Sequence, residues 1–279
     1  MKSLNIRFLF LFFVFTKLVF AQFDPGAKQI ALSNSDIAVS DNVFALFNNP
    51  AGIAQIDNAQ VGVFYSPSPF GLGELKNAYG AFSFPMSFGA IAVGGMVYGF
   101  ELYKESKISV ALSYNYKNKF YVGVTTNYKN IFIKNYGSKN VIIYDLGVLA
   151  IITEDLHLGF SYRNITRTSI SKSIDDLPVE ILSGLSYRII NNCTISLAIE
   201  KDIRYKASPR FGIDYKIIEF LSLRSGFSKN PNLYTFGIGI HYSFFNFNYA
   251  LFTHQELGLT HQIGVVITFG NSKGKKDVE

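Results

Sequence analysis

The sequence predicts a transmembrane antiparallel β-barrel of about 14 strands. Three observations carry this prediction: apolar side chains recur at every second position from Ala59 to Phe269, the strand-like segments are even in number, and short connections alternate with longer ones. The composition agrees, because only 16% of the residues are charged while 27 are Phe and 17 are Tyr. Soluble globular domains carry roughly 25% charged residues.

The first 21 residues have the organisation of a secretory signal peptide. Lys2 and Arg7 form a basic start, an apolar run covers Phe8–Phe15, and the small residues Val19 and Ala21 precede the expected cleavage site. The apolar run is shorter than the roughly 20 residues that a membrane-spanning helix needs. We therefore expect export and cleavage after Ala21.

The charge and the cysteine content exclude several classes of function. The formal net charge of +6 includes three basic residues of the leader, so the remainder carries 23 basic and 20 acidic residues. These are scattered along the segments, which argues against nucleic-acid binding. The single cysteine, Cys193, provides neither a disulfide framework nor a metal cluster.

The alternation is clearest in the segment ISVALSYNY. Ile108, Val110 and Leu112 share one face, while Ser109 and Ala111 lie on the other. In a soluble β-sandwich the apolar face would be the core, whereas in an outer-membrane barrel it faces lipid. Aromatic residues at strand ends, and glycine with charge on the opposite face, favour the barrel. The aromatic residues are Tyr114, Tyr116, Tyr128, Tyr162, Tyr187 and Tyr242.

The segments and their connections extend this reading along the chain. We expect tight turns at joints such as Pro85–Met86 and longer loops such as Phe132–Val141 between them. The expected strands are Gln60–Ser66, Asn77–Phe84, Ser87–Phe100, Lys107–Tyr116, Lys119–Ile131, Ile142–Ile152, Leu156–Thr166, Val179–Ile189, Cys193–Ile203, Ser208–Ile217, Phe220–Ser228, Leu233–Phe244, Phe247–Thr253 and Thr260–Phe269.

Two stretches resemble a known family. The first, GAKQIALSNSDIAVSDNVFALFNNPAGIA, resembles the N-terminal segment of the FadL-like outer-membrane proteins, especially the PorV and PorQ branch. The second, Leu257–His261, resembles the LGxTH phrase before the last strand of that branch. The organisation expected from this likeness is a signal peptide (1–21), an N-terminal hatch or plug segment (22–58), a transmembrane barrel (59–270) and a polar tail (271–279).

The resemblance implies that the N-terminal segment folds into the barrel as a plug, and the residues are compatible with this. A short helical turn over Val43–Phe47 can follow Asp41 or Asn42, and Pro50 biases Asn49 toward an extended conformation. We assign the hatch motif and the candidate ligand contacts accordingly. The motif is Asn49, Pro50, Ala51 and Gly52, and the contacts are Phe44, Leu46 and Phe47.

Charged residues on the predicted lumen face form a second candidate site. They suit either structural ion pairs that fill the interior or a polar path for a solute. The residues are Glu200, Asp202, Arg210, Asp214 and Arg224. No serine lies in a nucleophile-elbow phrase, and His254 and His261 match no compact metal-ligand spacing, so we expect no enzyme, metal or cofactor.

Two functions are consistent with these observations. By resemblance to PorV and PorQ, the protein would be a non-enzymatic accessory component of type IX secretion, with secretion-machinery proteins as partners. Alternatively, it would be a FadL-type passive transporter of small hydrophobic molecules, gated by the hatch. Either function places it in an outer membrane, in contact with lipid.

Overall fold

The computed structural model describes residues 25–170, 177–254 and 258–270, and within them the chain forms fourteen strands and five short helices. The strands are β1 (Ala59–Ser66), β2 (Asn77–Met86), β3 (Gly89–Gly99), β4 (Tyr103–Tyr116), β5 (Phe120–Ile133), β6 (Gly137–Ile151), β7 (Leu156–Arg163), β8 (Glu180–Ile190), β9 (Cys193–Asp202), β10 (Ser208–Ile218), β11 (Leu221–Ser228), β12 (Leu233–Tyr242), β13 (Phe245–His254) and β14 (Gly258–Phe269). The helices are α1 (Ala27–Ala31), α2 (Ala45–Asn48), η1 (Pro50–Gln55), η2 (Pro69–Gly71) and η3 (Gly73–Leu75).

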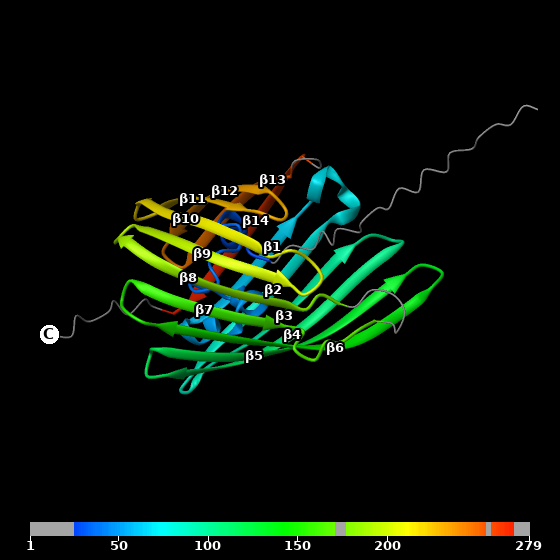
Figure 1. Ribbon diagram of the computed structural model, residues 1–279, viewed down its shortest axis with the longest axis horizontal. Coiled ribbons are helices and arrows are strands. Elements are labelled where there is room, and N and C mark those ends of the chain that lie inside the picture. The colour runs from blue at the N-terminus through cyan, green and yellow to red at the C-terminus, as the bar shows by residue number, and fades with distance from the viewer. Residues whose placement is uncertain (1–24, 171–176, 255–257, 271–279) are drawn as a thin grey trace, which may run out of the picture.

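The strands form a closed barrel (Figure 1). Every strand pairs antiparallel with its neighbours in sequence, and β1 closes the sheet on β14 with a register that runs from Ala59 opposite Phe269 to Tyr65 opposite Ile263. The prediction of an antiparallel barrel of about fourteen strands is confirmed. No helix among the described residues is long and apolar enough to cross a membrane.

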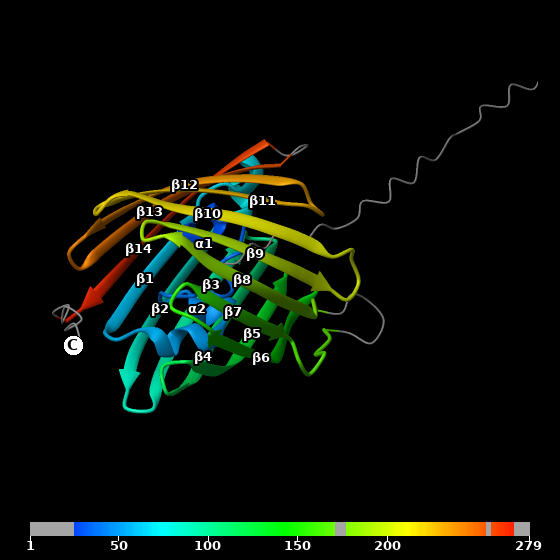
Figure 2. The ribbon, with the colours of Figure 1, turned by 60° about the vertical axis from the view of Figure 1, so that its left-hand side comes forward.

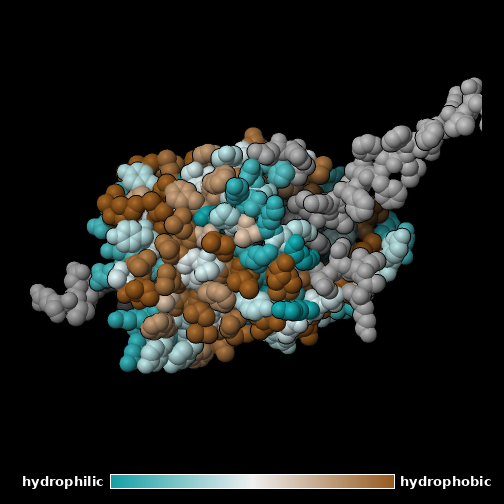
Figure 3. Space-filling view, viewed as in Figure 1, coloured by the Kyte–Doolittle hydropathy of each residue, from teal (hydrophilic) through white to brown (hydrophobic). Residues whose placement is uncertain are grey.

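The large apolar side chains face outward and the small ones face the lumen. On β4, Ile108, Val110 and Leu112 are 55–58% exposed, whereas Ser109 and Ala111 are almost completely buried. Figure 3 shows large apolar residues over much of the outer surface. A soluble sandwich would have the opposite arrangement, because its apolar face would be its core.

The two ends of the barrel differ in their connections. At the end where β1 begins and β14 ends, here called the turn end, the six connections are two to four residues long. At the opposite end, the loop end, the β1–β2 connection (67–76) and the β7–β8 connection (164–179) are much longer. The sorting by length is incomplete, because several loop-end connections are also short.

One expected loop is a continuation of two strands. The range Phe132–Val141 was expected to be a loop, but β5 continues to Ile133 and β6 begins at Gly137. Ser138, Lys139 and Asn140 are all exposed, so this part of β6 lies where both faces meet polar surroundings. Apolar alternation is lost there, and a search for alternation misses the strand although the backbone ladder continues.

The predicted leader, Met1–Ala21, and the polar tail, Asn271–Glu279, lie outside the described residues. The described part of the N-terminal segment, residues 25–58, includes α1, α2 and η1. Figure 2 shows α1 and α2 within the ring of strands. Helix α1 contacts β11 to β14, whereas α2 contacts β3 and β4, and η1 contacts β3 to β6.

Candidate functional site

The candidate site consists of the N-terminal segment (residues 25–58) and the part of the lumen above it, toward the loop end. Most of this segment is buried, and Asn49, Ala51 and Ile53 have no measurable exposure. Apolar residues of α2, β1 and β2 pack together, with Phe44 edge-on to Phe64 at a ring distance of 6.4 Å. The segment is therefore buried against the lumen wall, and its apolar side chains form a core with those of the wall.

The predicted motif Asn49–Gly52 forms a bend between α2 and η1. Asn49 is extended, with φ −138° and ψ 99°, and Pro50 is the first residue of η1. The Asn49 amide nitrogen donates to the carbonyl oxygen of Ile37 (2.9 Å) and to that of Val148 on β6 (3.2 Å). Its amide oxygen accepts a hydrogen bond from the Ala51 backbone nitrogen at 3.3 Å. One side chain thus ties two parts of the segment to the wall.

The helical turn begins slightly later than the sequence indicated. The expected turn was Val43–Phe47, and the observed helix α2 is Ala45–Asn48. Of the two expected capping residues, Asn42 acts near this turn: its side-chain oxygen accepts from the Phe44 backbone nitrogen at 3.0 Å. Asp41 instead pairs with Lys28, with its carboxylate 2.6 Å from the ammonium group.

Wall glycines make the close approach of the segment possible. A Cβ added to Gly147 would lie 2.2 Å from the Asn49 amide oxygen, and one added to Gly123 would lie 2.4 Å from the Pro50 carbonyl carbon. Ten wall glycines are so placed that an added Cβ would lie within 3.4 Å of the segment. They are Gly62, Gly94, Gly123, Gly147, Gly159, Gly184, Gly212, Gly226, Gly237 and Gly264. The sequence shows these glycines but not what fills the space they leave.

Wall side chains also satisfy the irregular backbone of the segment. The hydroxyl of Thr235 donates to the Ala31 carbonyl oxygen at 2.8 Å, and that of Ser161 donates to the Asn48 carbonyl oxygen at 3.1 Å. Ser113 donates to the carbonyl oxygen of Pro50. Buried carbonyl groups need such partners, because leaving them unpaired costs free energy.

The three candidate contact residues have different surroundings. Phe47 lines the lumen cavity described below, and its ring lies 5.0 Å from that of Tyr79. Phe44 and Leu46 are also buried but are not among the cavity-lining residues. Phe44 faces Gly62, and Leu46 faces Gly94. The geometry thus favours only Phe47 as a ligand contact.

A cavity of about 850 Å³ lies in the loop-end half of the lumen, with Phe47 and residues following α1 among its lining. Apolar and aromatic side chains form part of its wall, namely Phe47, Tyr79, Tyr103, Ile131, Leu233 and Phe252. Strands β7 to β10 supply an ionic part, in which Arg163 pairs with Glu180 at 3.1 Å and Arg210 pairs with Glu200 at 2.6 Å. The volume suits a small organic molecule.

The predicted lumen charges divide into two groups. Glu200, Asp202 and Arg210 line the cavity. Asp214 and Arg224 pair with each other at 3.0 Å and are not among the cavity-lining residues. An ion pair of the kind that would fill the interior joins Arg210 on β10 to Glu200 on β9. Arg210 also donates to the Ser33 carbonyl oxygen at 3.3 Å. Asp202 pairs instead with Arg204, at 2.7 Å.

The N-terminal segment contains a buried carboxyl group, that of Asp36. This residue is 4% exposed, and its Oδ2 atom has no hydrogen-bond partner among the described residues. Burial raises the pKa of Asp36 to about 7, although Lys28 opposes this shift. Burial would lower the pKa of Lys28, but the carboxylates of Asp41 and Asp214 raise it above its ordinary value.

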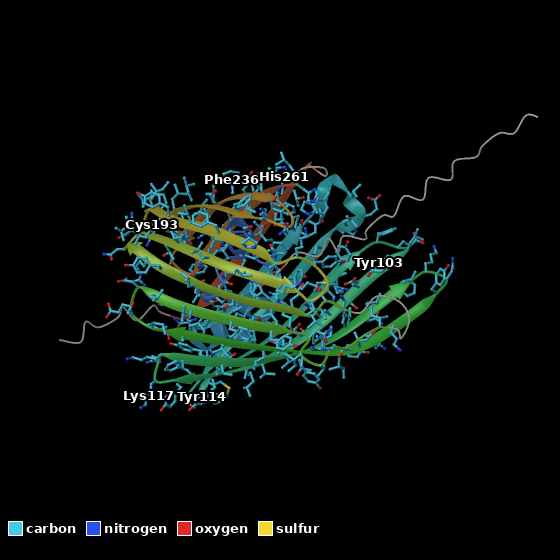
Figure 4. All side chains as sticks on the ribbon, in the orientation of Figure 1. Tyr103, Tyr114, Lys117, Cys193, Phe236 and His261 are labelled. Atoms are coloured by element: carbon cyan, nitrogen blue, oxygen red, sulfur yellow. The ribbon has the colours of Figure 1, made fainter. Side chains whose placement is uncertain are left out.

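Sequence reasoning missed the ionic and aromatic group on β4. Glu105 is 3% exposed and pairs with Lys129 at 2.7 Å, and the Tyr103 hydroxyl donates to Glu105. Figure 4 places Tyr103 and Tyr114 at opposite ends of β4. The expected strand began at Lys107, so Tyr103 and Glu105 were not assigned to the lumen wall. Two large residues on the small faces of β2 and β3, Tyr79 and Tyr98, were detectable signals, and Tyr98 packs edge-on against Tyr103.

Histidines give no support to a metal site. Among the described residues, no group of three or more His, Cys, Asp or Glu side chains is placed to hold a metal ion. His254 lines the cavity, whereas His261 is exposed and its Nδ1 atom lies 2.6 Å from the Tyr249 hydroxyl. The two histidines considered as a pair in the sequence thus have different environments.

Comparisons with known proteins identify the fold. No family model matches the sequence, and no curated protein matches it. Among solved structures, the toluene transporter TbuX of Ralstonia pickettii is similar with a TM-score of 0.67 and 12% identity, over 88% of this chain and 98% of that one. The monoaromatic hydrocarbon channel CymD has a TM-score of 0.66 and 11% identity, with the same coverages.

A third similar structure is a FadL homologue of Pseudomonas aeruginosa. Its TM-score is 0.59 at 12% identity, over 85% of this chain and 96% of that one. The structural neighbours are thus FadL-type barrels that include hydrocarbon transporters, and at this level of identity the likeness extends to the fold alone. The narrower resemblance to PorV and PorQ stays a prediction.

Proposed function

We propose that this protein is a FadL-type passive transporter of small hydrophobic molecules in an outer membrane, and that residues 25–58 act as its hatch. The cavity of about 850 Å³ carries the proposal, because it joins aromatic wall residues to Phe47 of the hatch. A solute held in this cavity would contact the proposed hatch, which separates the cavity from the rest of the lumen. The transport functions of TbuX and CymD support the same reading.

The outward apolar face supports the proposed location. Residues such as Ile108, Val110 and Leu112 are more than half exposed on one strand, and lipid is the environment in which this exposure is favourable. No observation on the described residues favours the accessory role in type IX secretion that the PorV and PorQ resemblance implied, so we put forward transport alone.

Uptake of radiolabelled toluene by a host that lacks its own hydrophobic channels tests the proposal. Expression of the protein should raise toluene uptake and leave sucrose uptake unchanged. Ile131 is a buried cavity-lining residue and Phe132, next to it, is exposed on the outer face. Ile131→Trp, which fills part of the cavity, should lower uptake severalfold, whereas Phe132→Trp should not. Equal toluene uptake with and without the protein would refute transport.

A further inference from the structure

The connection between β1 and β2 contains an aromatic residue in an unfavourable backbone conformation. Phe70 in η2 has φ 58° and ψ 25°, the left-handed region, which bulky L-residues rarely adopt. This conformation costs free energy and persists only where surrounding contacts hold it. Contacts between Phe70 and the barrel must therefore offset this cost.

Phe70 is held by residues of the cavity wall. Its ring packs edge-on against Phe252 and His254, at centroid distances of 5.8 and 5.7 Å, and both of these residues line the cavity. Its backbone nitrogen donates to the Thr260 hydroxyl at 2.8 Å, and Thr260 is completely buried on β14. Phe70 thus reaches from the rim into the lumen.

The rest of the connection lies at the rim of the loop end, beside the same wall. Helix η2 contacts β14 and η3 contacts β3, while Leu75 packs on the buried cluster that contains Phe252 and Leu233. By contrast Gly71, Leu72, Gly73 and Glu74 are exposed. Phe70 and Leu75 pack on the buried cluster, and the Lys76 carbonyl oxygen accepts a hydrogen bond from the Gly99 backbone nitrogen at 3.2 Å.

We propose that the β1–β2 connection, residues 67–76, is a lid over the loop-end mouth of the barrel, and that Phe70 is its latch. With the latch seated, the ring covers Phe252 and His254 and the lid is closed. Withdrawal of the ring frees the backbone from its left-handed conformation, so opening recovers part of the free energy lost with the ring contacts. This lid is a second barrier, separate from the proposed hatch, and it acts whatever solute the cavity accepts.

Cysteine labelling tests the lid without any transport assay. In a Cys193→Ser background, Leu233→Cys places a thiol at a cavity-lining position that is 8% exposed. The probe is 2-sulfonatoethyl methanethiosulfonate, applied to the folded protein in detergent. Phe70→Ala should accelerate labelling about tenfold, which corresponds to about 1.4 kcal/mol in the lid equilibrium.

Two further variants make the test specific. Leu72→Ala alters a half-exposed residue of the same connection that belongs to none of the latch contacts, and it should leave the rate unchanged. Thr260→Val removes the acceptor of the Phe70 nitrogen without changing the lid sequence, and should accelerate labelling about threefold. Heat-modifiable migration on gels checks that each barrel is folded.

Two results would overturn the lid. One is a labelling rate in the parent equal to that of a free thiol, because the cavity would then already be open. The other is an equal rate in the parent, Phe70→Ala and Thr260→Val proteins. Because labelling does not depend on toluene, a failure of the transport proposal would leave this test unaffected.

Discussion

Asn49→Ala is the sharpest test of how the N-terminal segment is held in the lumen. The Asn49 side chain donates to the carbonyl oxygens of Ile37 and Val148 and accepts from the backbone nitrogen of Ala51. It has no exposure to solvent, so water does not replace these hydrogen bonds while the segment stays seated. We expect the variant to loosen the segment and leave the strands intact.

The magnitude follows from the three hydrogen bonds. Each contributes about 1 kcal/mol net, so their loss destabilises the seated segment by about 3 kcal/mol. Since 1.4 kcal/mol changes an equilibrium constant tenfold, the population of the unseated segment should rise roughly 100-fold. Truncation to alanine also leaves a space where the amide packed, which adds to this effect.

Hydrogen exchange followed by mass spectrometry measures this change on the folded barrel. Protection of peptides from residues 25–58 should fall about 100-fold, while protection of the barrel strands stays as in the wild type. Asn115→Ala is the control, because Asn115 makes its hydrogen bonds with Asn118 in an exposed turn. Unchanged protection of residues 25–58 in Asn49→Ala would refute the role assigned to this side chain. So would an equal loss in all strands.

Three further predictions concern the wall, the buried carboxyl group and the ionic pair. Gly123→Ala should destabilise the seated segment by about 1–3 kcal/mol through overpacking. Gly80→Ala is the control, because its added Cβ meets nothing within 4 Å. Hydrogen exchange of residues 25–58 compares the two variants. Burial raises the pKa of Asp36 from 3.8 to about 7 in the seated segment, so the seated segment favours the protonated carboxyl group. The resulting stabilisation of the seated segment is fully present below pH 3.8 and is lost as the pH rises to about 7. The free energy that protects the segment from exchange should fall across this range by about 1.4 kcal/mol per pH unit. Asp36→Asn should abolish this fall, and the same slope in the Asp36→Asn variant would contradict the role assigned to Asp36. Glu105→Ala leaves the buried ammonium group of Lys129 without this carboxylate and should lower the stability of the barrel by about 3 kcal/mol. The measurement is the temperature at which the heat-modified band appears on gels, which should fall. An unchanged temperature would show that this ion pair does not stabilise the barrel.

The alternation of side chains determined the fold class and most of the strand positions. On β4 the large apolar residues Ile108, Val110 and Leu112 alternate with small ones, and a closed antiparallel barrel is the structure that can expose such a face to lipid. Local chemistry also predicted the extended Asn49 before Pro50, because the proline ring restricts the preceding residue.

Tertiary structure alone decided which residues meet inside the lumen. Thr235 bonds to the Ala31 carbonyl oxygen across 204 positions of the chain, and the glycines that face the segment lie on ten strands. The same holds for Tyr103 and Glu105, whose strand continues beyond the apolar alternation, and for Phe70, whose contacts come from β13 and β14. A two-residue period in the sequence indicates which face of the sheet a side chain occupies. What lies opposite that face depends on how the barrel closes and on what fills it.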